Sequence, residues 1–518
     1  MGYETVLEQL HTIDREYRYL EKAAAVLQWD EETYLPAQGV AERAEQRALL
    51  QGVAHDRLTG AETGRLLEQL GSTPQNLRGD EKLPRIEGDF LKVMRRNYDR
   101  AVRLPADFVA GAARAEGLSQ AAWVEARRHN DFAAFLPHLI TMIDFARRRV
   151  EYWGFGEGGS AGSVYDGLLD IYEPGMTAQD IRTVFEPLRD RLVSLLKKIA
   201  RGPEPDVSFL KGPYDSDEQA RFNHELMDLL GFDLSRGRLD ISAHPFTTSL
   251  GSDDIRITTR YFKDNLLSSI FSVIHESGHA FYEMGFPPTI RGTCLAEGAS
   301  MSVHESQSRF WENVIGRGRP FWEGVFPMLQ THFPEYLGRI DTDSFYRAVN
   351  QVKPSLIRVD ADEVSYSLHI ILRFELEQRL FSGELKAEDL PSAWRSLMQE
   401  FLGLEPENDA QGVLQDVHWS MGSFGYFPSY ALGNLYGLQL WQKIREDLGD
   451  VETALARKNF KALHTWLRER VYCWGCRLDP AELLMNITGK KLSVTPFLEY
   501  IEAKYTKLYG LTTSGVSS

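Results

Sequence analysis

Hydrophobic positions recur every three or four residues along most of the chain. Near the N-terminus they fall at Leu7, Leu10, Ile13 and Tyr17. Similar patterns return over 181–200 and 366–381. This period is typical of helices that bury one face. Strand-like segments are scarce, and the clearest is 254–261, where β-branched residues cluster. The pattern predicts a mainly α protein with one small β-sheet.

Two stretches rich in glycine, serine or proline, 154–167 and 201–218, are predicted to be connections. The first contains a formal G-x-G-x-x-G at 154–159. A dinucleotide-binding loop of this kind follows a strand and opens a helix. Here an arginine-rich helical pattern precedes the glycines and a Ser-Ala-Gly-Ser run follows them. We therefore interpret 154–159 as an ordinary glycine loop.

Composition narrows the classes of protein. The chain has 518 residues, of which 43% are hydrophobic and 25% charged, as in ordinary globular proteins. Its net charge of -16 disfavours nucleic acid and anionic membranes as partners. The apolar stretch at 266–274 is too short to span a bilayer, and the N-terminus lacks the layout of a signal peptide. Three cysteines suit a reducing compartment, so we expect a cytoplasmic protein with no membrane partner.

The strongest chemical signal is the motif His275-Glu276-Ser277-Gly278-His279, which lies inside a helical pattern. Residues four apart on a helix share a face and rise by about 6 Å, so both imidazoles reach one metal ion. Glu276 lies about 100° around the helix, where it can hold a metal-bound water without being a ligand. The same motif occurs by chance in unrelated helices. This helix is apolar enough to be buried, however, and a buried glutamate needs a partner or a metal.

A catalytic zinc site takes a third protein ligand and keeps one position open for water. The metzincin extension of the motif would place glycine at position 282 and histidine at position 285. Tyr282 and Gly285 occupy those positions, which excludes that class.

The third ligand is therefore expected from a downstream helix. The segment 295–307 offers Glu297, His304 and Glu305. Glu283 is disfavoured because it lies two turns from His275 on the same helix. Spacing alone leaves Glu297 and Glu305 open.

The motif at 275–279, followed by His304-Glu305-Ser306-Gln307, resembles the M32 family of metallocarboxypeptidases, which is the carboxypeptidase Taq type. Four further segments are similar to patterns of that family. They are a W-D-x-x-T-x-x-P pattern at 29–36, D-x-R-x-T at 254–258, I-R-x-x-A-D at 357–362 and G-x-x-Q-D-x-H-W at 412–419. The resemblance covers most of the chain, and ordered motifs are far more specific than one H-E-x-x-H.

The resemblance implies that His275, His279 and Glu305 bind one divalent metal ion per subunit, zinc or cobalt. It assigns Glu276 as the general base and then the proton shuttle. The implied fold is a large helical metallopeptidase with two lobes around a long deep groove, usually a homodimer. The implied activity is removal of residues one at a time from peptides with a free C-terminus, with broad specificity.

Hydrolysis also needs donors for the tetrahedral oxyanion besides the metal. We expect His418 and Tyr430 to supply them, with Tyr426 contacting the substrate. The alternative for both tyrosines is aromatic packing in the core.

An exopeptidase must bind the terminal carboxylate of its substrate, for which a guanidinium is well suited. We expect Arg358 to do so. The alternative is a structural salt bridge with one of the neighbouring acids Asp360, Asp362 and Glu363. The role of Arg256 stays open.

Cys473 and Cys476 form a C-x-x-C in a late helical region. A redox site would need a thioredoxin-like βαβ unit and a zinc site a second pair, and the sequence has neither. We expect two reduced cysteines on a helix. Cys294 lies just before the segment with the candidate ligands, where its oxidation could disturb the metal.

Two other functions stay open. One is an endo-acting or dipeptidyl zinc oligopeptidase of the related helical class, and the other is a helical scaffold with a structural metal. Length alone suggests three or four domains. The motifs between 254 and 430 must converge on one metal, however, so we expect a single catalytic domain, 1–518. Its metal-binding core spans about 250–435, and the helices of about 1–200 form the groove wall or cover.

Overall fold

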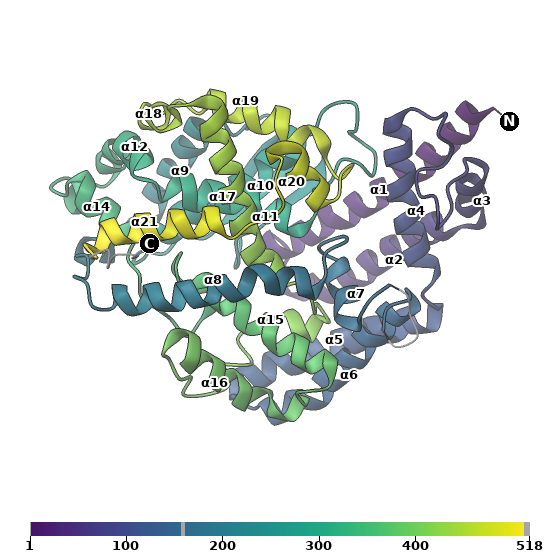
Figure 1. Ribbon diagram of the computed structural model, residues 1–518, viewed down its shortest axis with the longest axis horizontal. Coiled ribbons are helices and arrows are strands. Elements are labelled where there is room, and N and C mark those ends of the chain that lie inside the picture. Colours follow the sequence, from purple (N-terminus) through teal and green to yellow (C-terminus); the bar gives the residue numbers. More distant parts are fainter. Residues whose placement is uncertain (1, 157–160, 512–518) are drawn as a thin grey trace, which may run out of the picture.

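The computed structural model describes residues 2–156 and 161–511, and helices dominate it (Figure 1). The three periodic segments of the sequence are the helices α1 (Tyr3–Thr33), α8 (Ala178–Ile199) and α15 (Tyr366–Ser382). The predicted fold class, mainly α with one small sheet, is confirmed. The glycine loop expected at 154–159 falls partly outside the described residues, at 157–160. None of the described helices combines the length and apolar character that crossing a bilayer requires.

The first 200 residues contribute eight α-helices to the described part of the chain. Besides α1 and α8 these are α2 (Val40–Thr59), α3 (Ala61–Gln69), α4 (Arg85–Val102), α5 (Ala106–His129), α6 (Phe132–Tyr152) and α7 (Val164–Asp170). Helices α1 to α4 lie together at one side of the molecule, far from α12, α14 and α18 (Figure 1).

The middle of the chain holds the sheet and the helices around it. These helices are α9 (Ser216–Leu230), α10 (Leu266–Gly285), α11 (Met301–Arg309), α12 (Arg319–His332), α13 (Pro334–Leu337) and α14 (Thr342–Val349). A π-helix, η3 (Phe310–Gly316), continues α11.

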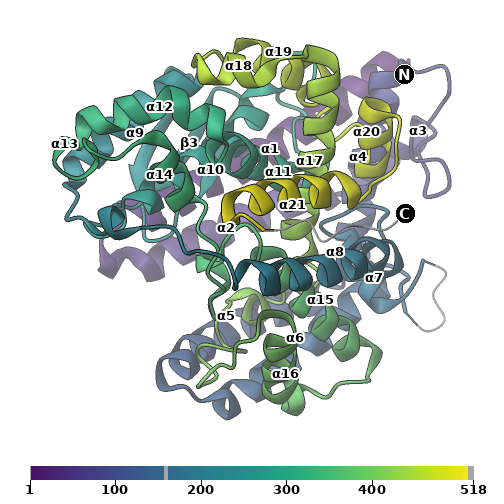
Figure 2. The ribbon, with the colours of Figure 1, turned by 60° about the vertical axis from the view of Figure 1, so that its left-hand side comes forward.

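The C-terminal part of the chain packs back onto the N-terminal helices and onto the middle part. Its helices are α15, α16 (Leu390–Leu402), α17 (Pro428–Leu448), α18 (Val451–Ala456), α19 (Lys461–Arg470), α20 (Pro480–Thr488) and α21 (Thr495–Tyr509). Helix α8 lies between α21 on one side and α15 on the other in both views (Figures 1 and 2). Segments far apart in sequence therefore build one packed structure.

The sheet has three strands in the order β1-β3-β2. The predicted strand at 254–261 is β3 (Asp254–Thr259), which ends two residues earlier than expected. It pairs in parallel with β1 (Gly237–Ile241) and antiparallel with β2 (Thr247–Gly251). Strand β3 also packs against α10, which places the sheet beside the helix with the H-E-x-x-H motif.

Helix α10 forms where the sequence predicts it. The Asn265 side chain accepts a hydrogen bond from the Ser268 amide at 3.2 Å, a cap that contributes about 1 kcal/mol. Its apolar positions, such as Ile270 and Ile274, are fully buried. The helix ends at Gly285, where a Cβ atom would lie 2.2 Å from the Tyr472 ring.

Two glycines let three helices approach closely at the centre of the molecule. A Cβ atom on Gly278 of α10 would lie 2.7 Å from the Gln307 carbonyl oxygen of α11. A Cβ atom on Gly433 of α17 would lie 2.8 Å from Cγ of Glu305. Helix α11 is therefore held between α10 and α17 at backbone contact, which brings Glu305 close to the motif on α10.

Candidate active site

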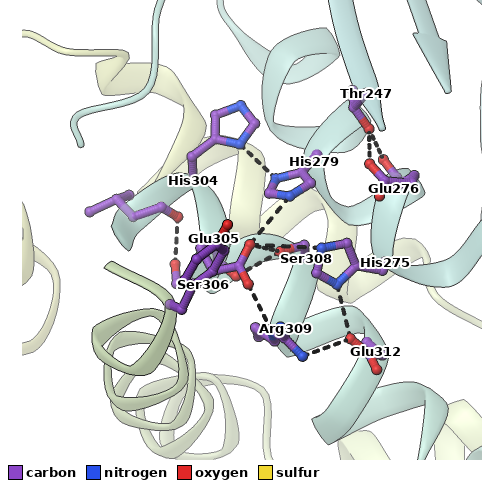
Figure 3. Close-up of polar contacts among 12 residues, drawn as sticks. Thr247, His275, Glu276, His279, His304, Glu305, Ser306, Ser308, Arg309 and Glu312 are labelled. Atoms are coloured by element: carbon purple, nitrogen blue, oxygen red, sulfur yellow. Dashed lines mark hydrogen bonds and ion pairs between the residues drawn. The ribbon is translucent and has the colours of Figure 1, made fainter. Parts of the chain in front are cut away.

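His275 and His279 of α10 and Glu305 of α11 point toward one centre (Figure 3). Their ligand atoms lie within 4.8 Å of one another. The Glu305 Oε2 atom is 3.7 Å from Nε2 of His275 and 3.4 Å from Nε2 of His279. A tetrahedral ion with bonds of about 2.0–2.1 Å separates its ligand atoms by about 3.3 Å. The three side chains therefore fit a divalent metal ion.

The outer nitrogen of each imidazole is held by a hydrogen bond. Nδ1 of His275 lies 2.9 Å from Glu312 Oε2. Nδ1 of His279 lies 2.6 Å from Nδ1 of His304, whose Nε2 lies 2.9 Å from Glu283 Oε1. A carboxylate only accepts, so His304 donates to Glu283 and accepts from His279. Both motif imidazoles then carry their proton on Nδ1 and present the Nε2 lone pair to the centre.

Charged groups around the centre shift the pKa of each imidazole differently. Burial lowers both pKa values, but the carboxylates of Glu305 and Glu312 outweigh burial at His275 and raise its pKa. Burial, with the neighbouring His304, lowers the pKa of His279 to about 4. Burial acts to raise the pKa of Glu305, but Arg309 and His275 hold it well below its usual range.

Arg309 connects Glu305, the candidate ligand, with the outer carboxylate Glu312. Its Nε donates to Glu305 Oε1 at 2.7 Å, and its Nη1 donates to Glu312 Oε2 at 3.3 Å. Glu312 also accepts from Arg317 at 3.2 Å. Glu312 lies on the π-helix η3, a rare form that often marks functional sites.

The geometry separates the candidates for the third ligand. Glu305 joins the two histidines, whereas Glu297 pairs with Arg18 at 2.6 Å and lies outside the cluster. His304 and Glu283 are not among the three grouped residues either. They form the hydrogen-bonded chain behind His279.

Glu276 is 6% exposed and lies beside the cluster without belonging to it. Its Oε2 accepts a hydrogen bond from Oγ1 of Thr247, on strand β2, at 2.6 Å (Figure 3). Burial raises the pKa of Glu276, which makes its carboxylate more basic than one in water. This is the property that a general base needs.

His418 and Tyr430 are brought together as a pair. His418 begins the short 3₁₀ helix η6 (His418–Met421), and Tyr430 lies in the first turn of α17. His418 Nε2 is 3.1 Å from the Tyr430 hydroxyl. Burial lowers the pKa of His418 to about 3, so its imidazole is neutral at neutral pH. The Tyr426 ring packs edge-on against Tyr430 at 5.1 Å.

Arg358 is buried, and its partner differs from the neighbouring acids expected for a salt bridge. Its Nε donates to Asp416 Oδ1 at 2.9 Å, and its Nη1 lies 3.2 Å from the Tyr366 hydroxyl. Arg373 donates to the other oxygen of Asp416 at 2.7 Å. Two guanidinium groups thus share one carboxylate, and one positive charge is left over.

Tyr366 joins this pair of arginines to the metal-ligand cluster. The Arg309 guanidinium lies 4.1 Å from the centre of the Tyr366 ring, while the Tyr366 hydroxyl contacts Arg358. Arg358 in turn lies 4.9 Å from the centre of the Tyr430 ring. The candidate residues predicted on α10 and α11 therefore occupy one continuous region with Arg358 and Tyr430.

Arg256 has contacts away from this region. It binds Asp254 through two hydrogen bonds of 2.8 Å and lies over the Trp29 ring at 4.2 Å. Arg238 of β1 lies 5.5 Å from the same ring. Two arginines of the sheet thus lie against Trp29, and Lys22 of α1 donates to the Ser249 carbonyl oxygen of β2 at 2.6 Å, so α1 docks on the sheet through both contacts.

The three cysteines are free thiols. The prediction that Cys473 and Cys476 share a helix is wrong. Cys473 lies in a short 3₁₀ helix, η7 (Tyr472–Trp474), and Cys476 follows this helix in a turn. The positive φ of Gly475, 52°, breaks the helical path between them.

Sequence reasoning missed Thr247, Arg309 and Glu312. Arg309 lies four residues after Glu305 and Glu312 seven after it, so helical spacing could have placed both on the face of the ligand. Thr247 carries no such signal, because only strand pairing brings it to α10.

Comparison with known proteins finds matches over almost the whole chain. The profile of the family described as carboxypeptidase Taq (M32) metallopeptidase matches residues 9–505. Thermostable carboxypeptidase 1 of Thermus thermophilus is 41% identical over 517 residues, 98% of this chain and 100% of that protein. Carboxypeptidase 1 of Bacillus subtilis is 38% identical over 513 residues, 97% of this chain and 99% of that protein.

Solved structures share the fold. The crystal structure of the M32 carboxypeptidase from Deinococcus radiodurans R1 superimposes with a TM-score of 0.93 at 39% identity, covering 98% of this chain and 100% of that one. Membership of a metallopeptidase family also implies a divalent metal ion, for which the cluster on α10 and α11 is suited. The chain belongs to the M32 family of metallocarboxypeptidases and is a peptide hydrolase.

Proposed function

We propose that His275, His279 and Glu305 hold one divalent metal ion and that Glu276 is the general base of peptide hydrolysis. The observation that carries this proposal is the convergence of three ligand atoms within 4.8 Å, next to a buried glutamate. When bound, the ion would supply Lewis acidity at this place, which would lower the pKa of a water molecule and polarise a carbonyl oxygen. Thr247 holds Oε2 of Glu276, so Oε1 takes the proton from water and later delivers it to the leaving amine.

His418 and Tyr430 stabilise the negative charge that develops on the carbonyl oxygen. The neutral imidazole of His418 orients the Tyr430 hydroxyl through their 3.1 Å contact. A hydroxyl oriented in advance stabilises charge more than a free one, because it does not reorganise during the reaction. Tyr426, packed against Tyr430, contacts the substrate beside it.

Arg358 binds the terminal carboxylate of the substrate. Asp416 orients the guanidinium through Nε, and the pair of arginines around Asp416 keeps a net positive charge in a buried place. Low exposure strengthens attraction for an anion. Recognition of the terminus at Arg358 makes the enzyme remove residues from the C-terminal end, with broad specificity for their side chains.

The family resemblance supports further proposals. The metal is zinc or cobalt, one ion per subunit, and the chain forms a cytoplasmic homodimer. Three free cysteines agree with a reducing compartment. The whole chain is one catalytic domain, because α1 docks on the sheet that holds Thr247, and residues between 247 and 430 surround one centre.

The test compares one peptide with a free and with an amidated C-terminus, with mass spectrometry of the products. We expect release of single C-terminal residues from the free peptide and at least a ~10² loss of kcat/KM on amidation, because a buried guanidinium loses its charged partner. Arg358→Met should remove this preference. The matched variant Arg395→Met, at a surface arginine that pairs with Asp409, should keep it.

Equal cleavage of both peptides would show that the enzyme does not read the terminal carboxylate and is endo-acting. Release of dipeptides would identify a dipeptidyl peptidase.

A further inference from the structure

Glu173 is a fully buried carboxylate that the proposed mechanism does not use. It lies in the turn after α7. Its Oε1 accepts hydrogen bonds from the Ser302 backbone amide at 2.6 Å and from the Ser429 hydroxyl at 3.4 Å. Ser302 is in the first turn of α11 and Ser429 in the first turn of α17. One carboxylate therefore faces the N-terminal turns of two helices.

This arrangement is electrostatically favourable. The first turn of a helix has unpaired N–H groups and a partial positive charge, so a carboxylate there is stabilising. In α11 the Met301 amide donates to the Tyr172 carbonyl oxygen at 3.0 Å, and the Val303 amide donates to the Ser300 hydroxyl at 3.1 Å. Because the Ser302 amide donates to Glu173, each of the first three backbone amides of α11 has a hydrogen-bond partner. Two of the three partners come from the segment 172–173.

The same segment reaches the substrate side of the site. The Tyr172 ring packs edge-on against Tyr426, with ring centres 4.9 Å apart. Residues 172 and 173 thus contact α11, α17 and the ring proposed to touch the substrate.

Stability alone does not account for a glutamate at this position. The Oε2 atom of Glu173 is buried without a hydrogen-bond partner among the described residues. Burial raises the pKa of Glu173 to about 7, which reflects the cost of keeping the charge there. A buried oxygen without a partner costs about 1–3 kcal/mol, which offsets part of what the hydrogen bonds of Oε1 contribute.

The two bridged helices carry the two parts of the proposed site. Helix α11 carries Glu305, and α17 carries Tyr430. Their contact at Gly433 determines how closely the helices approach. The bridge at Glu173 ties their first turns to one point, and so relates the position of Glu305 to that of Tyr430.

We propose that Glu173 is a positioning residue that ties the first turns of α11 and α17 together and thereby sets the geometry of the metal ligand Glu305 relative to Tyr430. This inference rests on the proposed metal site. It adds a residue more than 100 positions away in sequence from either group that it positions.

The test is titration of the metal-free protein with cobalt(II), followed by visible absorption, which reports both affinity and ligand geometry. For Glu173→Ala we expect a rise in the Kd for cobalt of at least about tenfold and a changed spectrum at saturation. We expect a lower kcat with an unchanged KM, because Arg358 lies on neither helix. Glu173→Gln keeps an acceptor for the Ser302 amide and should show a smaller rise in Kd.

Glu377→Gln is the matched control. Glu377 is equally buried, and burial raises its pKa to about 7 as well. Its partners are Tyr165, Trp419 and Gly425, none of which is on α11. The Kd of the Glu377→Gln variant for cobalt and its spectrum at saturation should match those of the wild type.

A Glu173→Ala protein with the wild-type Kd and spectrum, and only a lower melting temperature, would overturn the inference. If that variant does not fold, the same result from Glu173→Gln overturns it. Failure of the wild-type protein to bind cobalt or zinc would instead contradict the proposed metal site itself.

Discussion

The metal-ligand cluster (His275, His279 and Glu305) and the arginine group (Arg358, Arg373 and Asp416) each combine buried and half-buried side chains, but they differ in how far their charges are already paired. In the cluster, three acceptor atoms face one another at 3.4–3.7 Å where Glu305 meets the imidazoles. Lone pairs at this distance repel unless a cation lies between them. In the arginine group, cations and anion are already in contact, and one positive charge remains.

The difference shows what each region can bind. A cation would complete the cluster, and the anionic end of a peptide would complete the arginine group, as we propose. The regions also differ in assembly, because the cluster comes from two successive helices whereas the arginine group joins three separate segments. Tyr366, between Arg309 and Arg358, puts the two complementary sites next to each other. Three predictions test this division of roles, from the largest effect to the smallest.

Glu276→Gln should separate chemistry from metal binding. The amide keeps the shape of Glu276 but cannot take a proton, so we expect kcat to fall by between about 10² and 10⁴. The metal content of the purified variant, measured by elemental analysis, should stay near that of the wild type. Unchanged turnover would remove Glu276 from the mechanism.

Tyr430→Phe should lower kcat without changing metal affinity. Loss of one donor to a developing oxyanion costs about 10² in kcat. Steady-state kinetics with a peptide of free C-terminus measures this loss, and KM should hold because Arg358 is intact. Tyr505→Phe, at a buried tyrosine of α21 whose hydroxyl bonds to Glu363, is the control and should leave kcat unchanged. Equal losses in both variants would point to a general loss of packing.

Glu312→Gln should lower the metal affinity of the metal-ligand cluster without affecting recognition of the substrate terminus by the arginine group. Glu312 accepts from His275 Nδ1, and loss of such a partner raises the metal Kd by about 10- to 100-fold. Competition with a chromophoric chelator measures the affinity. At saturating metal, the preference for a free over an amidated C-terminus should stay. Glu323→Gln, at a surface pair with Arg319, is the matched control.

The helices and the motif could be predicted from the sequence because their signals are local. Apolar spacing located α1, α8 and α15, and the spacing of His275 and His279 requires only a helix. The strands β1 and β2 were not predicted, because each has five residues and β2 is only partly buried along its length. The partner of Arg358 was missed for a related reason, since Asp416 is 58 residues away.

The sequence by itself determined the residues that can bind a metal, the helix that carries two of them, and the family. It left Glu297 and Glu305 equivalent by spacing. Tertiary structure separates them, because contact at Gly278 and Gly433 holds α11 between α10 and α17 and brings Glu305 to the two histidines, whereas Glu297 pairs with Arg18. Spacing along a chain fixes distances only within one helix. Distances between helices depend on how closely their backbones pack, and here the two glycines set that limit.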